Sequence, residues 1–78
     1  METFTLTTEF IRLDALLKVE AVASSGGEAK HLIQGGGVYL NGAPETQRGK
    51  KIRKGDLVEV YPDNAKQGAA PLASIRVE

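Results

Sequence analysis

Apolar and polar residues alternate at the start of the chain and then change to a helical spacing. Threonines flank Phe4 and Leu6 between Thr3 and Thr7, a period of two that predicts a short, half-buried strand at a sheet edge. Over Glu9 to Val22 the apolar residues follow the helical period, which predicts a first helix. Its N-cap is expected at Thr7 or Thr8, and its buried stripe is expected to consist of Phe10, Leu13, Leu16, Leu17 and Ala21.

A second, shorter helix is predicted over Gly27 to Gln34. Ser24 or Ser25 can cap its first turn, and Gly35 ends it. Ala29, Leu32 and Ile33 share one face of this helix, which is expected to pack on the core. Lys30 and His31 are left toward the outer side.

The rest of the chain has the spacing of short strands and turns. Val38 to Leu40 precedes Asn41-Gly42, a strong hairpin signal because a type I′ turn needs two residues with positive φ. Further strands are expected at 43–46 and 57–61. A flexible segment is expected at 62–71, and an edge strand at 74–77 that can pair with the N-terminal strand.

These elements predict an α+β fold in which two N-terminal helices pack on a small, mostly antiparallel twisted sheet. The 78 residues are few enough for a single domain over 1–78, with its core in 10–61.

Composition removes several classes of site. The chain has no cysteine and one histidine, so neither a disulfide framework nor a cysteine zinc site is possible and no metal site is expected. Acids occupy the N-terminus where a signal peptide would carry basic residues, and no apolar run is long enough to span a membrane. We therefore expect a cytoplasmic protein with no membrane contact.

Charge is balanced overall but unevenly distributed. Ten basic and ten acidic residues give a net charge of zero, yet residues 12–54 hold eight Lys or Arg against four acids. Five of these cations stand in the seven residues 48–54, which we call the basic loop: Arg48, Lys50, Lys51, Arg53 and Lys54. Such a cluster is either a solvated loop or a binding site for a polyanion, and a phosphate backbone supplies anions at suitable spacing.

The order of motifs resembles a known family. Arg12-Leu13-Asp14 is followed by Leu17, Ser25, Ala29, Leu32-Ile33, Gly37-Val38, Asn41-Gly42 and Gly55-Asp56 before an apolar strand. This series is similar to the S4-type RNA-binding domain, named after a protein of the small ribosomal subunit and built on the αL motif. The sequence Ser-Gly-Gly-Glu-Ala-Lys at 25–30 resembles small free-standing bacterial members, where the family otherwise often has Ser-Arg. The resemblance implies ribosomal RNA or tRNA as the partner, and Lys30 is our substitute for the missing arginine.

Single residues have competing interpretations. Arg12 could only pair with a nearby acid, and the resemblance favours an RNA contact; Asp14 is expected to bond a backbone amide or orient a basic side chain. Asn41 is first a turn former, and Tyr39 could stack on a base or complete the core. The candidate RNA-binding residues are Arg12, Lys18, Lys30, His31, Asn41, Arg48, Lys50, Lys51, Arg53 and Lys54.

No catalytic constellation and no cofactor motif is recognisable. Carboxylates such as Asp14 lie in no apolar context, and the glycines at 35–37 lack the Lys-Ser or Lys-Thr of a P-loop. The sequence predicts non-catalytic binding of structured RNA. The alternatives are an adaptor whose basic loop docks an acidic protein and a subunit that delivers RNA to a separate enzyme.

Overall fold

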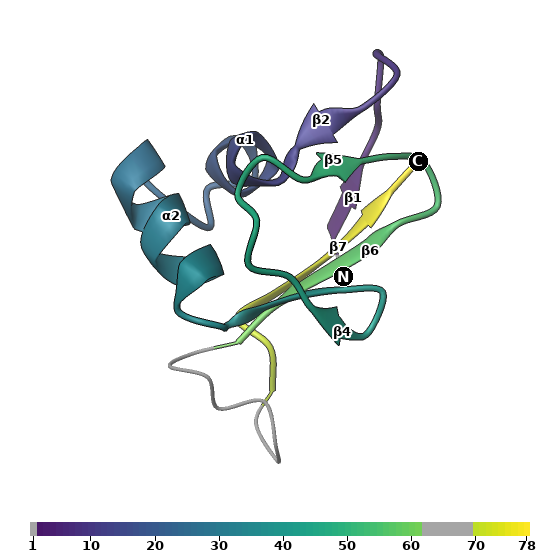
Figure 1. The fold of residues 1–78 in the computed structure, drawn as a ribbon. Coiled ribbons are helices and arrows are strands. Elements are labelled where there is room, and N and C mark those ends of the chain that lie inside the picture. Colours follow the sequence, from purple (N-terminus) through teal and green to yellow (C-terminus); the bar gives the residue numbers. More distant parts are fainter. Residues whose placement is uncertain (1, 62–69) are drawn as a thin grey trace.

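The computed structural model describes residues 2–61 and 70–78 (Figure 1). The elements follow one another in the order β1 (Glu2–Phe4), β2 (Ile11–Arg12), α1 (Leu13–Val19), α2 (Gly26–Gln34), β3 (Val38–Leu40), β4 (Ala43–Pro44), β5 (Lys51–Ile52), β6 (Leu57–Val60) and β7 (Ala73–Val77).

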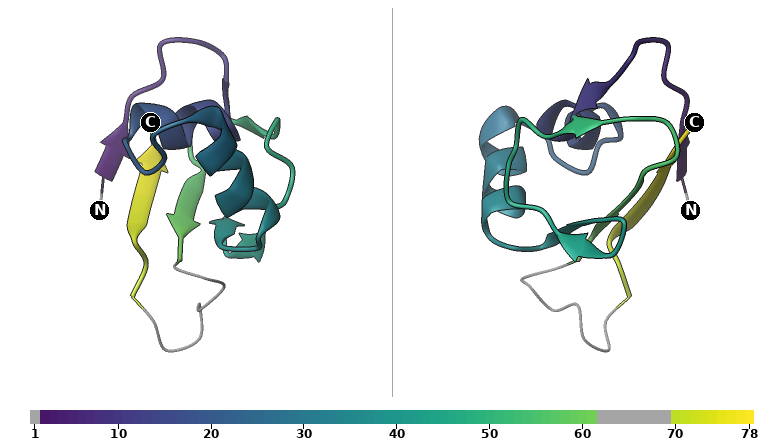
Figure 2. Two further views of the ribbon diagram at one scale, coloured as in Figure 1. Left: turned by 90° about the vertical axis from the view of Figure 1, so that its left-hand side faces the viewer. Right: turned by 45° about the vertical axis from the view of Figure 1, so that its right-hand side comes forward.

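The sheet is mostly antiparallel, as the sequence predicts. Among the described residues its five strands lie in the order β1-β7-β6-β3-β4, and only the β1–β7 pair is parallel. β2 and β5 form a separate antiparallel pair. Two helices on one face of this sheet give the predicted α+β architecture (Figure 2).

The helices do not come first in the chain, and the first is shorter than predicted. Two strands precede α1, which begins at Leu13 because Ile11 and Arg12 are extended and pair with β5. The Thr8 hydroxyl bonds the Phe10 carbonyl and caps no helix. The periodicity of apolar residues could not show that the helix begins at Leu13. Residues 10, 13 and 17 have a helical spacing whether or not residues 10–12 are themselves helical.

The buried stripe of α1 is correspondingly narrower. Leu13, Leu16 and Leu17 are fully buried, while Phe10 lies before the helix and is half-buried. The helix ends at Val19, and Ala21 is exposed with a φ of 60°. A positive φ at this residue stops the helical path before Val22.

The second helix follows its prediction closely. Ser25 caps it by accepting the Glu28 amide at 3.1 Å, and the Glu28 carboxylate accepts the Ser24 amide at 2.9 Å. This reciprocal arrangement satisfies two amide donors at the helix start. The turn after the helix takes its positive φ at Gly36 (89°).

The hairpin at Asn41-Gly42 is confirmed, with φ values of 51° and 88°. The return strand β4 covers only 43–44 of the predicted 43–46. The C-terminal strand does pair with the N-terminal one, but it lies between β1 and β6. The prediction of an edge strand at 74–77 was therefore wrong, because β1 takes that edge. Of the predicted flexible segment 62–71, residues 62–69 lie outside the described residues.

A single apolar cluster joins the helices to the sheet. Its fully buried side chains come from both helices, from β5 and from three strands of the sheet: Leu13, Leu16, Leu17, Ala29, Ile33, Val38, Ile52, Val58, Val60, Ile75 and Val77. Because Ile52 belongs to this cluster, the basic loop is attached to the same core as the helices. Neither helix in the described ranges has the length and apolarity to cross a membrane.

Candidate nucleic-acid interface

The basic loop is partly a strand. Lys51 and Ile52 form β5, and Ile52 is fully buried while Arg48, Lys50, Lys51, Arg53 and Lys54 are exposed. The one apolar residue thus points inward and the cations around it remain in solvent. The expectation of a loop without secondary structure was incomplete, because two residues are too short a strand to be recognised from sequence.

Backbone hydrogen bonds tie the basic loop to the start of α1. The Leu13 amide donates to the Lys50 carbonyl at 2.9 Å, and the Asp14 amide donates to the Arg48 carbonyl at 3.0 Å. In the adjoining β2–β5 pair, Arg12 stands opposite Lys51. Residues separated by more than thirty positions in sequence therefore form one basic surface. The pairing of β2 with β5 places Arg12 beside the loop.

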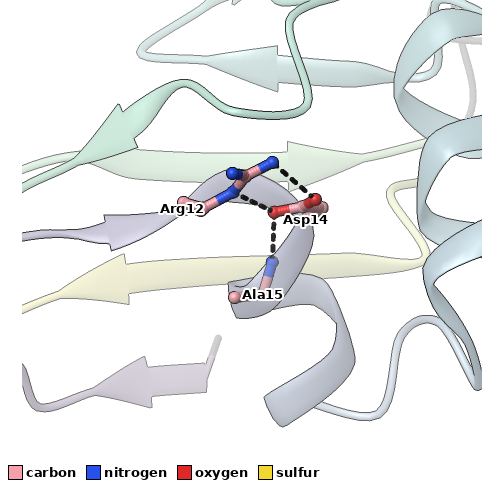
Figure 3. Close-up of polar contacts among 3 residues, drawn as sticks. All are labelled: Arg12, Asp14 and Ala15. Atoms are coloured by element: carbon pink, nitrogen blue, oxygen red, sulfur yellow. Dashed lines mark hydrogen bonds and ion pairs between the residues drawn. The ribbon is translucent and has the colours of Figure 1, made fainter.

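Arg12 is held by Asp14 (Figure 3). Its Nε donates to one carboxylate oxygen at 3.1 Å and its Nη2 to the other at 3.2 Å, while the first oxygen also accepts the Ala15 amide at 2.8 Å. Both roles expected of Asp14, bonding an amide and orienting a basic side chain, are confirmed. A Cβ placed on Gly49 would lie 3.5 Å from Nη2 of Arg12, so the guanidinium lies against the middle of the loop.

The charge of Asp14 is stabilised at this position. Partial burial alone would raise the pKa of its carboxyl. Hydrogen bonds from Arg12 and from the Ala15 amide, together with the charges of Arg12 and Arg48, outweigh that effect and lower the pKa below the ordinary value of 3.8. The carboxylate is therefore ionised wherever the protein is near neutral pH.

Phe10 supports two of the cations, which the sequence did not reveal. The Lys51 ammonium lies 4.9 Å from the ring centroid and the Arg53 guanidinium 5.8 Å from it, both within the range of a cation–π contact. Arg53 also pairs with Glu9 at 3.7 Å. The sequence held one indication that Lys51 and Arg53 could contact the same ring: residues two apart in an extended segment point to the same side.

Asn41 uses both ends of its amide within the protein. Its Nδ2 donates to Asp56 at 3.0 Å and its Oδ1 accepts the Leu57 amide at 2.8 Å. Asp56 in turn accepts the Arg53 amide at 2.8 Å. These bonds join the hairpin to the turn after β5, where Lys54 is exposed beside Gly55.

The remaining candidates lie on the helices. Lys18 is in the last turn of α1, and Lys30 and His31 are on α2; all three are exposed. No hydrogen bond or ion pair joins them to the basic loop within 2–61 and 70–78. Tyr39 packs edge-on against Tyr61 with ring centroids 5.6 Å apart, which favours its role in the core.

The described residues contain no group of three or more His, Cys, Asp or Glu able to hold a metal ion. A shallow hollow of about 580 Å³ lies away from the basic loop, between β1, the end of α1 and the start of β7. Two glutamates, the exposed Glu2 and the half-buried Glu20, are among its lining residues.

Comparison with known proteins agrees with this geometry. Residues 4–67 match the family model described as the S4 domain. The chain belongs to the S4 domain family. A probable ribosome maturation protein, RlbA of Bacillus subtilis (strain 168), is 40% identical to this S4 domain over 55 residues, which are 70% of this chain and 78% of the relative. The resemblance drawn from the motifs is thereby confirmed, and the matched range includes both helices and the whole basic loop.

Proposed function

We propose that this S4 domain binds structured RNA and does not catalyse a reaction on it. The observation that carries the proposal is the basic loop held beside Arg12. Arg48, Lys50, Lys51 and Lys54 make no ion pair with any residue in the described ranges, so their charges are available to phosphates.

We infer recognition of shape and backbone, because A-form RNA offers phosphates and 2′-hydroxyls in a shallow minor groove. Ribosomal RNA is the proposed class, since the relative from Bacillus subtilis is named a probable ribosome maturation protein; tRNA has no such support. The chain would act as a single domain in the cytoplasm, where ribosomal RNA is found.

The proposed contacts have two tiers. Arg12 and the five cations of the basic loop form the main contact surface. Lys18, Lys30 and His31 extend it only if the RNA reaches across the helices, and Asn41 contributes by holding the hairpin in place.

Titration of a labelled RNA hairpin at several salt concentrations tests the proposal. With about four to six phosphate contacts, the slope of log K against log salt should be roughly −3 to −5. Duplex DNA of the same sequence is the matched control, because it lacks the 2′-hydroxyls. The proposal fails if the chain does not bind the RNA at low salt, or binds it with a slope near zero.

A further inference from the structure

Arg12 differs from its neighbours in how firmly its guanidinium is oriented. Two of its nitrogens bond the two oxygens of one carboxylate, at 3.1 and 3.2 Å. Arg53, by comparison, meets Glu9 at 3.7 Å, and the Glu9 side chain is 85% exposed. A bidentate pair fixes the plane of the guanidinium, whereas a single long contact to an exposed side chain does not.

Asp14 is itself held in place by the fold. Its side chain is only 19% exposed, its carboxylate accepts the Ala15 amide, and its own amide donates to the Arg48 carbonyl. The acid that orients Arg12 is thus fixed to the first turn of α1 and to the basic loop at once.

The guanidinium keeps free donors after this pairing. Of the five N–H groups of an arginine, Asp14 occupies one on Nε and one on Nη2. Nη1 points away from the carboxylate (Figure 3), and the Arg12 side chain is 55% exposed. Its remaining donors are therefore available to an anion that approaches from the side opposite Asp14.

We propose that Asp14 is a positioning residue for RNA binding, because it holds Arg12 so that the free edge of the guanidinium, opposite the carboxylate, meets an RNA phosphate. This inference rests on the proposed function. It assigns a favourable role to an acid inside a surface that binds a polyanion.

Simple electrostatics predicts the opposite sign for the same residue. Removing a carboxylate from a basic surface lessens its repulsion of phosphates and should strengthen binding. Positioning predicts weaker binding, since an unrestrained arginine must lose side-chain freedom when it meets the RNA. The direction in which RNA affinity changes when Asp14 is replaced therefore distinguishes positioning from simple electrostatic repulsion.

The experiment compares four variants of the full chain with the unaltered protein, by titration of a fluorescently labelled RNA hairpin. They are Asp14→Asn, Arg12→Ala, the double variant and Glu9→Gln. Asparagine keeps an oxygen for the Ala15 amide but loses the charge and one acceptor for Arg12. Glu9→Gln is the matched control, because it also removes an acid paired with a basic-surface arginine. Circular dichroism identifies the temperature range in which every variant is folded.

We expect Asp14→Asn to weaken binding about two- to tenfold, the range set by immobilising one long side chain. In the Arg12→Ala background the same change should leave affinity unchanged or raise it, and Glu9→Gln should also leave it unchanged or raise it. The inference is overturned if Asp14→Asn strengthens binding as Glu9→Gln does. It is equally overturned if the loss is the same without Arg12, which would mean that Asp14 acts on the fold.

Failure of the inference can be distinguished from failure of the proposed function. If Arg12→Ala binds as well as the unaltered chain while binding stays salt-dependent, RNA binding stands and the role of Asp14 is refuted. If the unaltered chain does not bind the RNA, both fail.

Discussion

Single residues at the β2–α1 junction combine structural and binding roles. Asp14 bonds a backbone amide, an arginine and, through its own amide, the basic loop. A carboxylate with these partners stabilises the fold only while it is ionised, so its contribution must depend on pH.

The pH dependence of Asp14 has a definite direction. Its pKa in the folded protein is lowered from 3.8, so its stabilising contribution is complete above 3.8 and is lost as the pH falls through the folded value. We expect Asp14→Asn to lower the free energy of unfolding by about 1 kcal/mol near neutral pH. Urea unfolding of both proteins should show this difference shrinking in acid; a gap independent of pH would contradict the assignment.

Gly37 and Gly26 differ in how much room the fold leaves for a side chain. A Cβ on Gly37 would lie 2.7 Å from the Tyr61 carbonyl oxygen, a backbone atom that cannot turn aside, whereas a Cβ on Gly26 would meet nothing within 4 Å. Gly37→Ala should cost about 1 to 3 kcal/mol. Gly26→Ala, in the first turn of α2, should be neutral or stabilise the protein by up to about 1 kcal/mol. Thermal unfolding of the two variants checks the contrast, and equal midpoints would refute it.

At the scale of elements, the β2–β5 pair decides where the basic loop lies. Ile52 anchors β5 in the core, and the carbonyls of residues 48 and 50 accept amides at the start of α1. The loop is therefore held by its backbone and one apolar side chain, and we expect Lys50 and Lys54 to add little to the stability of the fold.

This division of roles predicts two different phenotypes in one loop. Ile52→Ala removes a fully buried side chain and should cost about 2 to 5 kcal/mol of stability. The double change Lys50→Ala and Lys54→Ala should stay within about 0.5 kcal/mol of the unaltered stability. The same double variant should weaken RNA binding and make the salt slope less steep by about 1 for each lost phosphate contact.

Urea unfolding and salt titrations measure both quantities. The pair 50 and 54 is preferred to 51 or 53, whose side chains contact Phe10. If the double variant unfolds at a clearly lower urea concentration than the unaltered protein, Lys50 and Lys54 have a structural role.

At the scale of the whole molecule, five cations are concentrated in the basic loop although the net charge is zero. β1 and β4 are the two edges of the sheet. The chain from β4 leads into the basic loop, while two glutamates line the hollow beside β1. An RNA bound at the basic surface would therefore approach from one side of the fold.

Amide shifts on addition of RNA should be largest around the basic loop. We expect shifts over 10–14 and 47–54, and little change over 2–4 and 71–74. Shifts at Lys30 and His31, with weaker binding of Lys30→Ala, would extend the surface to α2. Shifts confined to 47–54 would exclude Arg12 from the interface.

Local chemistry was enough to determine several parts of this protein from its sequence. Ser25 and Glu28 mark the start of α2, Asn41-Gly42 forms the hairpin, and the cations at 48–54 are exposed. Each feature follows from the preference of a residue for a backbone conformation, for a helix cap or for solvent. These preferences depend only on residues that are close in sequence.

The tertiary structure decided what depends on distant partners. It made residues 11–12 a strand, because β5 supplied their hydrogen bonds, and it placed β7 inside the sheet, because β1 paired along its outer side. It also brought Phe10 under two cations and Arg12 against Gly49. Sequence patterns report which faces are apolar, but the pairing of two-residue strands is fixed only when the core aligns them.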